Sequence, residues 1–349
     1  MRPGLAAVSR RIAVVLFNLG GPDRPDAVRP FLYNLFNDPA IIGLPALPRL
    51  LLATLVSSKR EKEAKGIYAR IGGGSPILEL TWRQAHALEA ALAGADEIRV
   101  FVAMRYWHPM SEETAREVAA FAPDRVVLLP LYPQFSTTTT ESSLGEWWRV
   151  ARRVGLTAPS HAICCYPDEP SFVAAHAGLL RRALDSIPGQ AARILFSAHG
   201  LPEKVVARGD PYPWQVERTA QAVLAALGGG HDAVVCYQSR VGPLTWIGPS
   251  TEHEIARAGH DGKAVVLVPI AFVSEHSETL VELDMTYAEL ARARGVARYV
   301  RVPALGEDPT FIAALAGLVR ATLTRYEPMS SGGCQRCPAA HRRCALATP

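Results

Sequence analysis

Eight short apolar runs, separated by longer stretches with helical spacing, constrain the fold of this chain more than any other feature. The runs cover residues 12–17, 98–104, 125–131, 161–166, 192–197, 233–237, 264–270 and 298–302. Most of them are continuously apolar rather than alternating, which is typical of parallel strands buried on both faces. Helical patterns such as Thr81–Leu92 and Glu112–Phe121 lie between them. This alternation predicts an α/β protein with doubly wound parallel sheets.

The eight runs divide evenly between the two halves of the chain. With 349 residues, the chain is long enough for two or three domains. We therefore expect two similar Rossmann-like domains, residues 1–175 and 176–328, with an active-site cleft between them. The last predicted helix has room to cross back to the first domain, and residues 329–349 form a cysteine-rich tail.

Composition and charge exclude several classes of function. Hydrophobic residues make up 49% of the chain and charged residues 20%, as in an ordinary globular protein. The net charge of +4 is small, and no block rich in Lys and Arg with interleaved aromatic residues indicates nucleic-acid binding. The first apolar run, residues 12–17, is too short for a signal-peptide core. We therefore expect a cytoplasmic protein that does not bind nucleic acid.

One segment, residues 41–58, is unusually apolar. It contains Pro45, Pro48 and Arg49, whereas a membrane-spanning helix needs about 20 clean apolar residues. Two interpretations of this segment are open. It is either a helix buried in the core or an apolar lip that contacts a membrane surface or a greasy substrate.

Titratable groups gather directly after two of the predicted strands. His199 lies in the hexapeptide SAHGLP at 197–202, and a second dense segment, residues 272–282, follows the run at 264–270. In open α/β sheets, functional groups lie at the carboxyl ends of strands, so the two segments are expected to place an imidazole opposite carboxylates. A histidine in such a position is able to accept a proton or bind a metal near pH 7.

The carboxylates of the second segment are regularly spaced. Glu275, Glu278 and Glu282 lie at i, i+3 and i+7, and Glu289 continues the series. On an α-helix these side chains form one stripe. Such a charge run is commonly a solvated face. Its position after a strongly apolar strand instead favours a line of carboxylates that leads inward and suits a divalent cation, with imidazole as a further ligand for iron or zinc.

Aromatic, basic and hydroxyl side chains follow several other predicted strands. Arg105 follows the second run, Tyr132 the third and Trp246 the sixth. Lys59 and Arg60 precede a glycine-rich loop, which lacks the spacing of a P-loop or a dinucleotide-binding loop. Each residue alone fits a packed ring or a helix cap. Together they predict a cleft with aromatic walls and basic or hydroxyl groups at its edge, which suits a large, flat, apolar ligand bearing carboxylates.

Three cysteines lie close together in the tail. They are Cys334, Cys337 and Cys344, with the spacing C-x2-C-x6-C. Three thiols need a fourth ligand to hold zinc or an iron–sulfur cluster. Cys164 or Cys165, after the fourth run, is available, and His341 is a zinc-compatible alternative. A disulfide is only weakly favoured in a chain without a secretion signal.

Taken in order, these segments make the chain resemble the ferrochelatase family, the enzymes that insert ferrous iron into a porphyrin. The resemblance covers about residues 12–325 and rests on FNLGGP (17–22), YARIGGGSPI (68–77), RYWHP (105–109), LYPQFS (131–136), SAHGLP (197–202), YQSRVGPLTWIGP (237–249) and PIAFVSEHSETLVELD (269–284). It implies two Rossmann-like domains around a porphyrin cleft and conversion of protoporphyrin IX and Fe²⁺ to protohaem, the terminal step of haem biosynthesis. Coproporphyrin III as the substrate, or a non-catalytic role in binding haem or porphyrin, are the alternatives.

The resemblance also implies roles for individual residues. His199 is the essential histidine, either the base for the pyrrole N–H protons or an iron ligand, and Glu278 is its acidic partner across the macrocycle. Glu275, His276 and Glu282 continue a polar line that would carry iron further into the protein. The residues implied to contact the porphyrin or its propionates are Leu19, Lys59, Arg60, Ser75, Arg105, Tyr132 and Trp246.

Some members of the family carry a [2Fe-2S] cluster on C-terminal cysteines, and the tail resembles that variant. It departs from the animal pattern in the x6 spacing and in Thr137, which stands where animal members have their distant cysteine. The resemblance therefore implies a cluster on Cys334, Cys337, Cys344 and either Cys165 or Cys164. It also implies that segment 41–58 is a lip of the cleft, with peripheral contact to the inner face of a membrane, and it is compatible with a homodimer.

Overall fold

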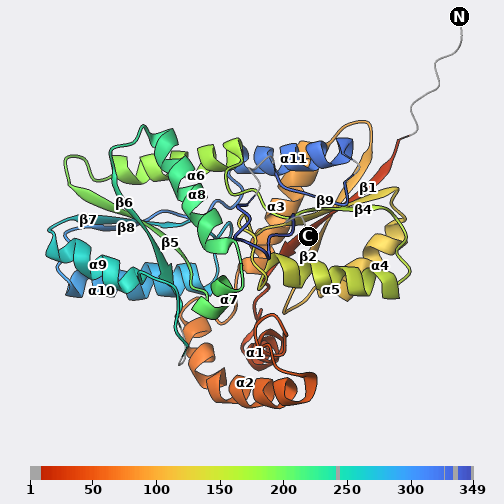
Figure 1. Ribbon diagram of the computed structural model, residues 1–349, viewed down its shortest axis with the longest axis horizontal. Helices are drawn as coiled ribbons and strands as arrows, with labels where there is room; N and C mark the ends of the chain where they lie inside the picture. The colour runs from red at the N-terminus through yellow and green to blue at the C-terminus, as the bar shows by residue number, and fades with distance from the viewer. Residues whose placement is uncertain (1–8, 241–243, 326, 333–336, 347–349) are drawn as a thin grey trace, which may run out of the picture.

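The computed structural model describes residues 9–240, 244–325, 327–332 and 337–346 (Figure 1). Its strands form two parallel sheets, ordered β2-β1-β3-β4-β9 and β6-β5-β7-β8. All eight apolar runs predicted from the sequence are strands of these sheets. The predicted α/β class with two doubly wound parallel sheets is therefore confirmed.

The first sheet collects the strands of the N-terminal half. They are β1 (Arg11–Asn18), β2 (Glu97–Met104), β3 (Arg125–Pro130) and β4 (Ser160–Ile163), together with the late strand β9 (Met329–Ser330). In the central strand β1, Val14 and Leu16 enter one core cluster, whereas Val15 and Phe17 enter another. Because successive side chains point to opposite faces, burial of both faces accounts for the continuous apolar run.

Strand β9 was not predicted from the sequence. It is two residues long, too short to carry a periodicity, and it pairs in parallel with β4. The expected division of four and four strands was therefore wrong, and among the described residues it is five and four. The chain reaches this edge after α11 (Pro309–Thr324), which packs against α3 (Ile77–Leu92) and α6 (Pro170–Asp185).

The second sheet contains the predicted histidine. Its strands are β5 (Ala192–His199), β6 (Asp232–Gln238), β7 (Ala264–Pro269) and β8 (Tyr299–Arg301). β5 lies between β6 and β7, and its last residue, His199, lies opposite Gln238. His199 therefore ends a central strand, at the carboxyl end of the sheet, where parallel α/β proteins place their ligands.

The helices that connect the strands include both predicted examples. Thr81–Leu92 falls within α3, and Glu112–Phe121 falls within α4 (Ser111–Phe121). The others not yet named are α1 (Val28–Phe36), α2 (Ala46–Ala69), α5 (Thr140–Arg153), α7 (Glu203–Ala207), α8 (Tyr212–Leu227), α9 (Thr251–His260) and α10 (Tyr287–Ala293), with a short 3-10 turn at Pro25–Ala27 and a π-helix, η2 (Glu278–Thr286).

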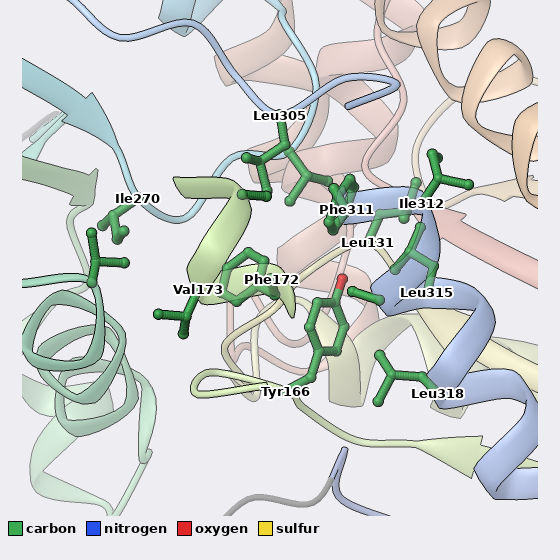
Figure 2. Close-up of a cluster of buried hydrophobic side chains, with 14 of the residues drawn as sticks. Leu131, Tyr166, Phe172, Val173, Ile270, Leu305, Phe311, Ile312, Leu315 and Leu318 are labelled. Carbon is green, nitrogen blue, oxygen red and sulfur yellow. The ribbon is translucent and has the colours of Figure 1, made fainter. Parts of the chain in front are cut away.

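The largest hydrophobic cluster joins the two sheets. It combines side chains of β1, β2 and β3 with those of β5, β6 and β7, and it also includes side chains of helices α3, α6, α8 and α11. Figure 2 shows Phe172 of α6 and Phe311 of α11 in this cluster, and their ring centroids are 6.2 Å apart. A shared core of this size fixes the strand ends of one sheet relative to those of the other.

Buried polar groups are also paired across the two halves. Asp210, fully buried before α8, accepts hydrogen bonds from Ser136 Oγ (3.0 Å) and Thr137 Oγ1 (2.7 Å). Gln134 donates to Thr219 Oγ1 at 3.0 Å and to the Ile270 carbonyl at 3.3 Å. Because these buried groups have partners, the contact between the halves avoids the cost of unpaired polar atoms.

Helix α2 lies apart from both sheets, at the bottom of Figure 1, with α1 beside it. Leu47, Leu51 and Leu55 follow one another at i, i+4 and i+8, and they are 78%, 70% and 66% exposed. The interpretation of segment 41–58 as a buried helix was therefore wrong. Among the described residues no helix is both long and apolar enough to cross a membrane.

Candidate active site at the carboxyl end of the second sheet

Gly200 allows β5 to present His199 close to its neighbours. A Cβ at position 200 would lie 3.0 Å from the Gln238 carbonyl oxygen and 3.4 Å from the Trp246 ring. A side chain at this position would be tightly packed, and its neighbours would have to move by a few tenths of an ångström. The turn therefore places His199, Trp246 and the end of β6 side by side.

His199 pairs with Glu278, and the two segments predicted an imidazole opposite carboxylates. The contact is direct, however, so the placement of Glu278 across a macrocycle from His199, which the resemblance implied, was wrong for this structure. The two groups are joined by a 2.8 Å contact between His199 Nδ1 and Glu278 Oε2, and their side chains remain 41% and 25% exposed. Burial alone would lower the pKa of His199, but the Glu278 carboxylate outweighs it and raises that pKa above its usual value. Burial opposes the charge of Glu278, yet His199 lowers the pKa of this carboxyl to about 2.

The carboxylates do not form the α-helical stripe that their spacing predicted, so this expectation was wrong. Glu278 opens a π-helix, and Glu275 precedes it. Glu275 instead lies 2.5 Å from Arg301 Nη1, which lowers the pKa of its carboxyl against the effect of burial. Glu289 lies beyond the π-helix, 3.8 Å from Arg70. The wider turn of a π-helix brings residues of different spacing together, and such helices are frequent at functional sites.

Ser239 joins the two carboxylates that remain close. Its hydroxyl lies 2.5 Å from Glu282 Oε2 and 3.1 Å from Glu278 Oε2, and its backbone N–H donates to Glu282 Oε1 at 3.0 Å. This serine has a φ of 59°, in the left-handed region that non-glycine residues rarely occupy. Backbone strain of this kind is common at functional sites, and here it aims the N–H and the hydroxyl at the same pair of acids.

Beyond Glu282, the polar contacts reach an exposed side chain. The Tyr287 hydroxyl lies 3.0 Å from Glu282 Oε1 and 3.0 Å from Glu252 Oε1, and Glu252 is exposed on α9. Burial, with the nearby charge of Glu278, raises the pKa of Glu282. The chain of contacts from His199 to Glu252 therefore contains groups that can each accept or donate a proton.

His276 lies next to this chain rather than within it. The ring is buried, and its Nδ1 lies 3.3 Å from the Ser274 carbonyl oxygen while its Nε2 lies 4.0 Å from Glu278 Oε1. Burial lowers the pKa of His276, so the neutral imidazole is favoured.

The residues predicted to contact the porphyrin are found in two groups. Trp246 lies against Gly200, next to His199. Leu19 packs with Tyr68 and Trp107, and the Tyr68 hydroxyl lies 3.5 Å from Ser277, beside Glu278. Through Tyr68, the hydrophobic cluster that includes Leu19 in the first half reaches Ser277, the residue before Glu278.

The other predicted porphyrin residues contact groups outside the pair formed by His199 and Glu278. Arg105 binds the buried Asp38 at 2.7 Å, Arg60 lies 3.7 Å from Glu63, and Lys59 is exposed on α2. The backbone N–H of Ser75 donates to the Pro22 carbonyl at 2.7 Å. The Tyr132 hydroxyl is buried and makes no hydrogen bond with a described residue. These contacts place no residue of this group within hydrogen-bond reach of His199.

The predicted cysteines are only partly within the structure. Cys334 lies outside the described residues. Cys337 accepts a hydrogen bond from Gln215 Nε2 at 3.2 Å, and the adjacent Cys344 thiol, together with burial, raises the pKa of Cys337. Cys164 Sγ and Cys165 Sγ are 3.5 Å apart and buried. Across the described ranges, no group of three or more His, Cys, Asp or Glu side chains is arranged to hold a metal ion.

Three residues of the site carried no assignment from the sequence. Ser239, Tyr68 and Tyr287 all contact the acidic groups directly or through one neighbour. Ser239 had a usable signal, because it follows the end of β6 by one residue. Tyr287 had none, because its approach to Glu282 depends on the π-helix.

The fold is of a type that solved chelatase structures share. The structure is similar to that of sirohydrochlorin chelatase SirB from Bacillus subtilis subspecies spizizenii in complex with cobalt, with a TM-score of 0.52 at 11% identity. The match covers 90% of this chain and 95% of that chain. At this identity the likeness is one of fold.

Sequence comparison specifies the family. The ferrochelatase family model matches residues 11–323. The ferrochelatase of Caulobacter vibrioides (strain NA1000 / CB15N) is 58% identical over 342 residues, which cover 97% of this chain and 98% of that protein. The ferrochelatase of Phenylobacterium zucineum is 55% identical over 339 residues, with 96% and 98% coverage. The chain belongs to the ferrochelatase family.

Membership of this family makes the chain an enzyme that inserts Fe²⁺ into a porphyrin. The relatives support protohaem formation from protoporphyrin IX. Neither coproporphyrin III as the substrate nor a non-catalytic porphyrin-binding role is favoured.

Proposed function

We propose that His199 is the base that removes the pyrrole N–H protons of protoporphyrin IX while Fe²⁺ enters the ring. The observation that carries this proposal is the 2.8 Å contact between His199 Nδ1 and Glu278 Oε2. An ionised carboxylate only accepts hydrogen bonds, so in the neutral imidazole the proton lies on Nδ1 and the lone pair on Nε2. Nε2 then takes the proton from the porphyrin, and Glu278 stabilises the imidazolium that forms.

We further propose that these protons leave along the contacts that lead away from Glu278. Ser239 connects Glu278 to Glu282, and Tyr287 connects Glu282 to Glu252, with each contact 3.1 Å or shorter. A carboxyl such as Glu282, whose pKa is raised, holds a proton more readily than an ordinary glutamate. Exposure of Glu252 gives the proton access to water.

Iron binding is proposed for the same end of the sheet. His199 and Glu278 offer nitrogen and oxygen donors that suit Fe²⁺, and His276 and Glu282 lie one contact away. Glu275 would contribute to this path through Oε2, because Arg301 and the Ala304 N–H both bind its Oε1.

For the porphyrin, the proposal assigns apolar contact to one set of residues and carboxylate binding to another. Leu19 and Trp246 would pack against the ring, and the unpaired hydroxyl of Tyr132 would gain a partner from the ligand. Arg60, Lys59, Arg105 and Ser75 would meet the propionates. Arg105 supports this least directly, because Asp38 already binds its guanidinium.

We propose that the tail cysteines hold a [2Fe-2S] cluster, because the tail resembles that variant of the family. The described residues fit it in part, because Cys337 lies beside Cys344 and close to Cys165. The set is completed by Cys334 with Cys165 or Cys164. Purified protein should show iron–sulfur absorbance that is lost in Cys337→Ser, whereas colourless protein with stoichiometric zinc contradicts the cluster.

The membrane contact is proposed for the leucines of α2. Their exposed stripe ends near Lys59, which suits a bilayer surface with anionic headgroups. With the cytoplasmic location expected from the sequence, the surface that we propose it meets is the inner face of a membrane. A homodimer rests on the resemblance alone, and the molar mass in solution tests it.

The test of the catalytic proposal is anaerobic iron insertion by His199→Ala, with protoporphyrin IX and coproporphyrin III assayed side by side. We expect turnover to fall by about a hundredfold or more, because a positioned base contributes that much, while porphyrin still binds. His253→Ala, which changes an exposed histidine of α9, is the matched control and should keep full turnover. Wild-type turnover by His199→Ala would refute the assignment of the base.

A further inference from the structure

Arg301 faces the π-helix from the end of β8, the strand at one edge of the second sheet. Its Nε and Nη2 donate to the two carboxylate oxygens of Asp284, each at 2.6 Å, and its Nη1 donates to Glu275 Oε1 at 2.5 Å. The side chain of Arg301 is 11% exposed. Two parallel hydrogen bonds to one carboxylate are strong and directional, so this ion pair fixes position as well as charge.

The two acids that Arg301 binds lie on either side of Glu278 in the sequence. Glu275 precedes the π-helix, and Asp284 lies within it, nine residues further on. In a continuous α-helix nine residues make about two and a half turns, so the two carboxylates would point to opposite faces. One guanidinium that binds both acids therefore fits the observed path of the chain and does not fit a regular α-helix.

The π-helical register decides which groups meet at the site. Glu278 contacts His199 and Ser239. Glu282 contacts Ser239 and the hydroxyl of Tyr287, which comes five positions later. A π-helix has hydrogen bonds from i to i+5 and is rare, so contacts from outside the segment are needed to favour it. Return of the segment to the tighter α-helical turn would rotate Glu282 and Tyr287 relative to Glu278.

We propose that Arg301 is a positioning residue that binds Glu275 and Asp284 at once and thereby holds the π-helix in the register that the site requires. The effect on turnover rests on the proposed function of His199 and Glu278. The effect on the π-helix does not, because these ion pairs exist without substrate. An arginine at the edge of the sheet therefore controls the alignment of the acids without touching the reacting atoms.

The experiment measures amide hydrogen exchange and iron insertion in the full chain, with Arg301→Met compared with wild type. Methionine keeps much of the apolar stem but removes every hydrogen bond of the guanidinium. Exchange in peptides that cover residues 278–287 should become on the order of tenfold faster, because local opening then breaks fewer contacts. We expect kcat to fall on the order of tenfold while KM for porphyrin stays within about twofold, because the register acts on the reacting geometry.

Arg301→Lys separates the geometry of the guanidinium from its charge. The ammonium keeps the positive charge, but it lacks the planar fork that binds both oxygens of Asp284 while a further N–H reaches Glu275. Its exchange rate and kcat should lie between those of wild type and Arg301→Met. Wild-type values of both in Arg301→Lys would show that charge alone is sufficient and would overturn the proposal.

Arg193→Met is the matched control. Arg193 lies in β5 of the same sheet, its side chain is 7% exposed, and it also binds two carboxylates, Asp232 at 2.9 Å and Asp261 at 3.0 Å. These contacts lie near the beginning of the strand that His199 ends. The variant should lower the melting temperature but leave kcat and exchange of the π-helix near wild type.

Three results would each overturn the proposal. They are unchanged exchange of the π-helix in Arg301→Met, unchanged kcat beside faster exchange in that variant, and an equal loss of kcat in Arg193→Met. Wild-type turnover by His199→Ala would instead count against the proposed base and leave the exchange result for Arg301 standing.

Discussion

The carboxyl end of the second sheet and helix α2 hold most of the residues assigned to ligand binding, and the two regions are built differently. At the sheet, the acids are largely buried and each has a partner, as in the contacts of Glu278 and Glu282 with Ser239. On α2, three leucines are mostly exposed, and Arg60 has only a long 3.7 Å ion pair. Proton transfer needs fixed donors and acceptors, whereas adsorption to an apolar surface needs only area and charge.

Removing the charge of Glu278, at the second sheet, should lower turnover more than any change on α2. In Glu278→Gln, kcat should fall by about a hundredfold or more, because the imidazolium of His199 loses its stabilising carboxylate. Glu278 raises the pKa of His199, so this pKa should fall in the variant. Only neutral His199 accepts a proton, and the acidic limb of the kcat profile should therefore move to lower pH. A pH series of single-turnover iron insertion measures both effects.

Glu289→Gln is the control for this prediction. Glu289 belongs to the same series in the sequence, but it lies away from the site near Arg70. The variant should keep both kcat and the pH profile. A loss of kcat in Glu289→Gln equal to that in Glu278→Gln would show that Glu278 has no special role beside His199. An unchanged acidic limb in Glu278→Gln would show that Glu278 does not raise the pKa of His199.

A smaller effect is expected further along the polar contacts. Tyr287→Phe keeps the buried ring but removes the hydroxyl between Glu282 and Glu252. We expect kcat to fall by about tenfold, with a larger solvent isotope effect because proton release becomes slower. Tyr299→Phe removes a hydroxyl that donates to the Leu283 carbonyl of the same π-helix at 2.7 Å, off the route. Equal isotope effects in the two variants would exclude a relay through Tyr287.

The sequence was sufficient for the features that depend on local pattern. Continuous apolar runs predicted all eight longer strands. The position of His199 after one of these runs predicted its place at the carboxyl end of the sheet. The pairing of His199 with Glu278 was also expected, because both follow parallel strands of one sheet. In these cases, a local signal and a general rule of α/β folds were enough.

The features that the sequence missed depend on contacts between distant segments. The spacing of Glu275, Glu278 and Glu282 predicted an α-helical stripe, but the segment is a π-helix and Arg301 binds Glu275. The buried Gln84 carries no signal in its own helix, because the groups that it binds on Val273, Ser274 and Gly306 lie about 190 to 220 residues later. Exposure of the α2 leucines was not predictable either, because an apolar pattern does not say whether another element covers it.

The smallest effect on turnover is expected for the exposed leucines of α2. Leu51→Glu replaces an exposed leucine in the middle of the stripe. Inserting a leucine into an apolar phase contributes about 1.5–3 kcal/mol, so affinity for anionic phospholipid vesicles should fall by roughly tenfold to a hundredfold. Turnover with detergent-dispersed porphyrin should stay within about twofold, because this side chain makes no contact with the acids.

Ala225→Glu, which adds the same charge on α8, should bind vesicles as wild type does. Unchanged vesicle binding by Leu51→Glu, or an equal loss in the α8 variant, would remove the membrane contact from α2 and leave the chemistry at the second sheet untouched.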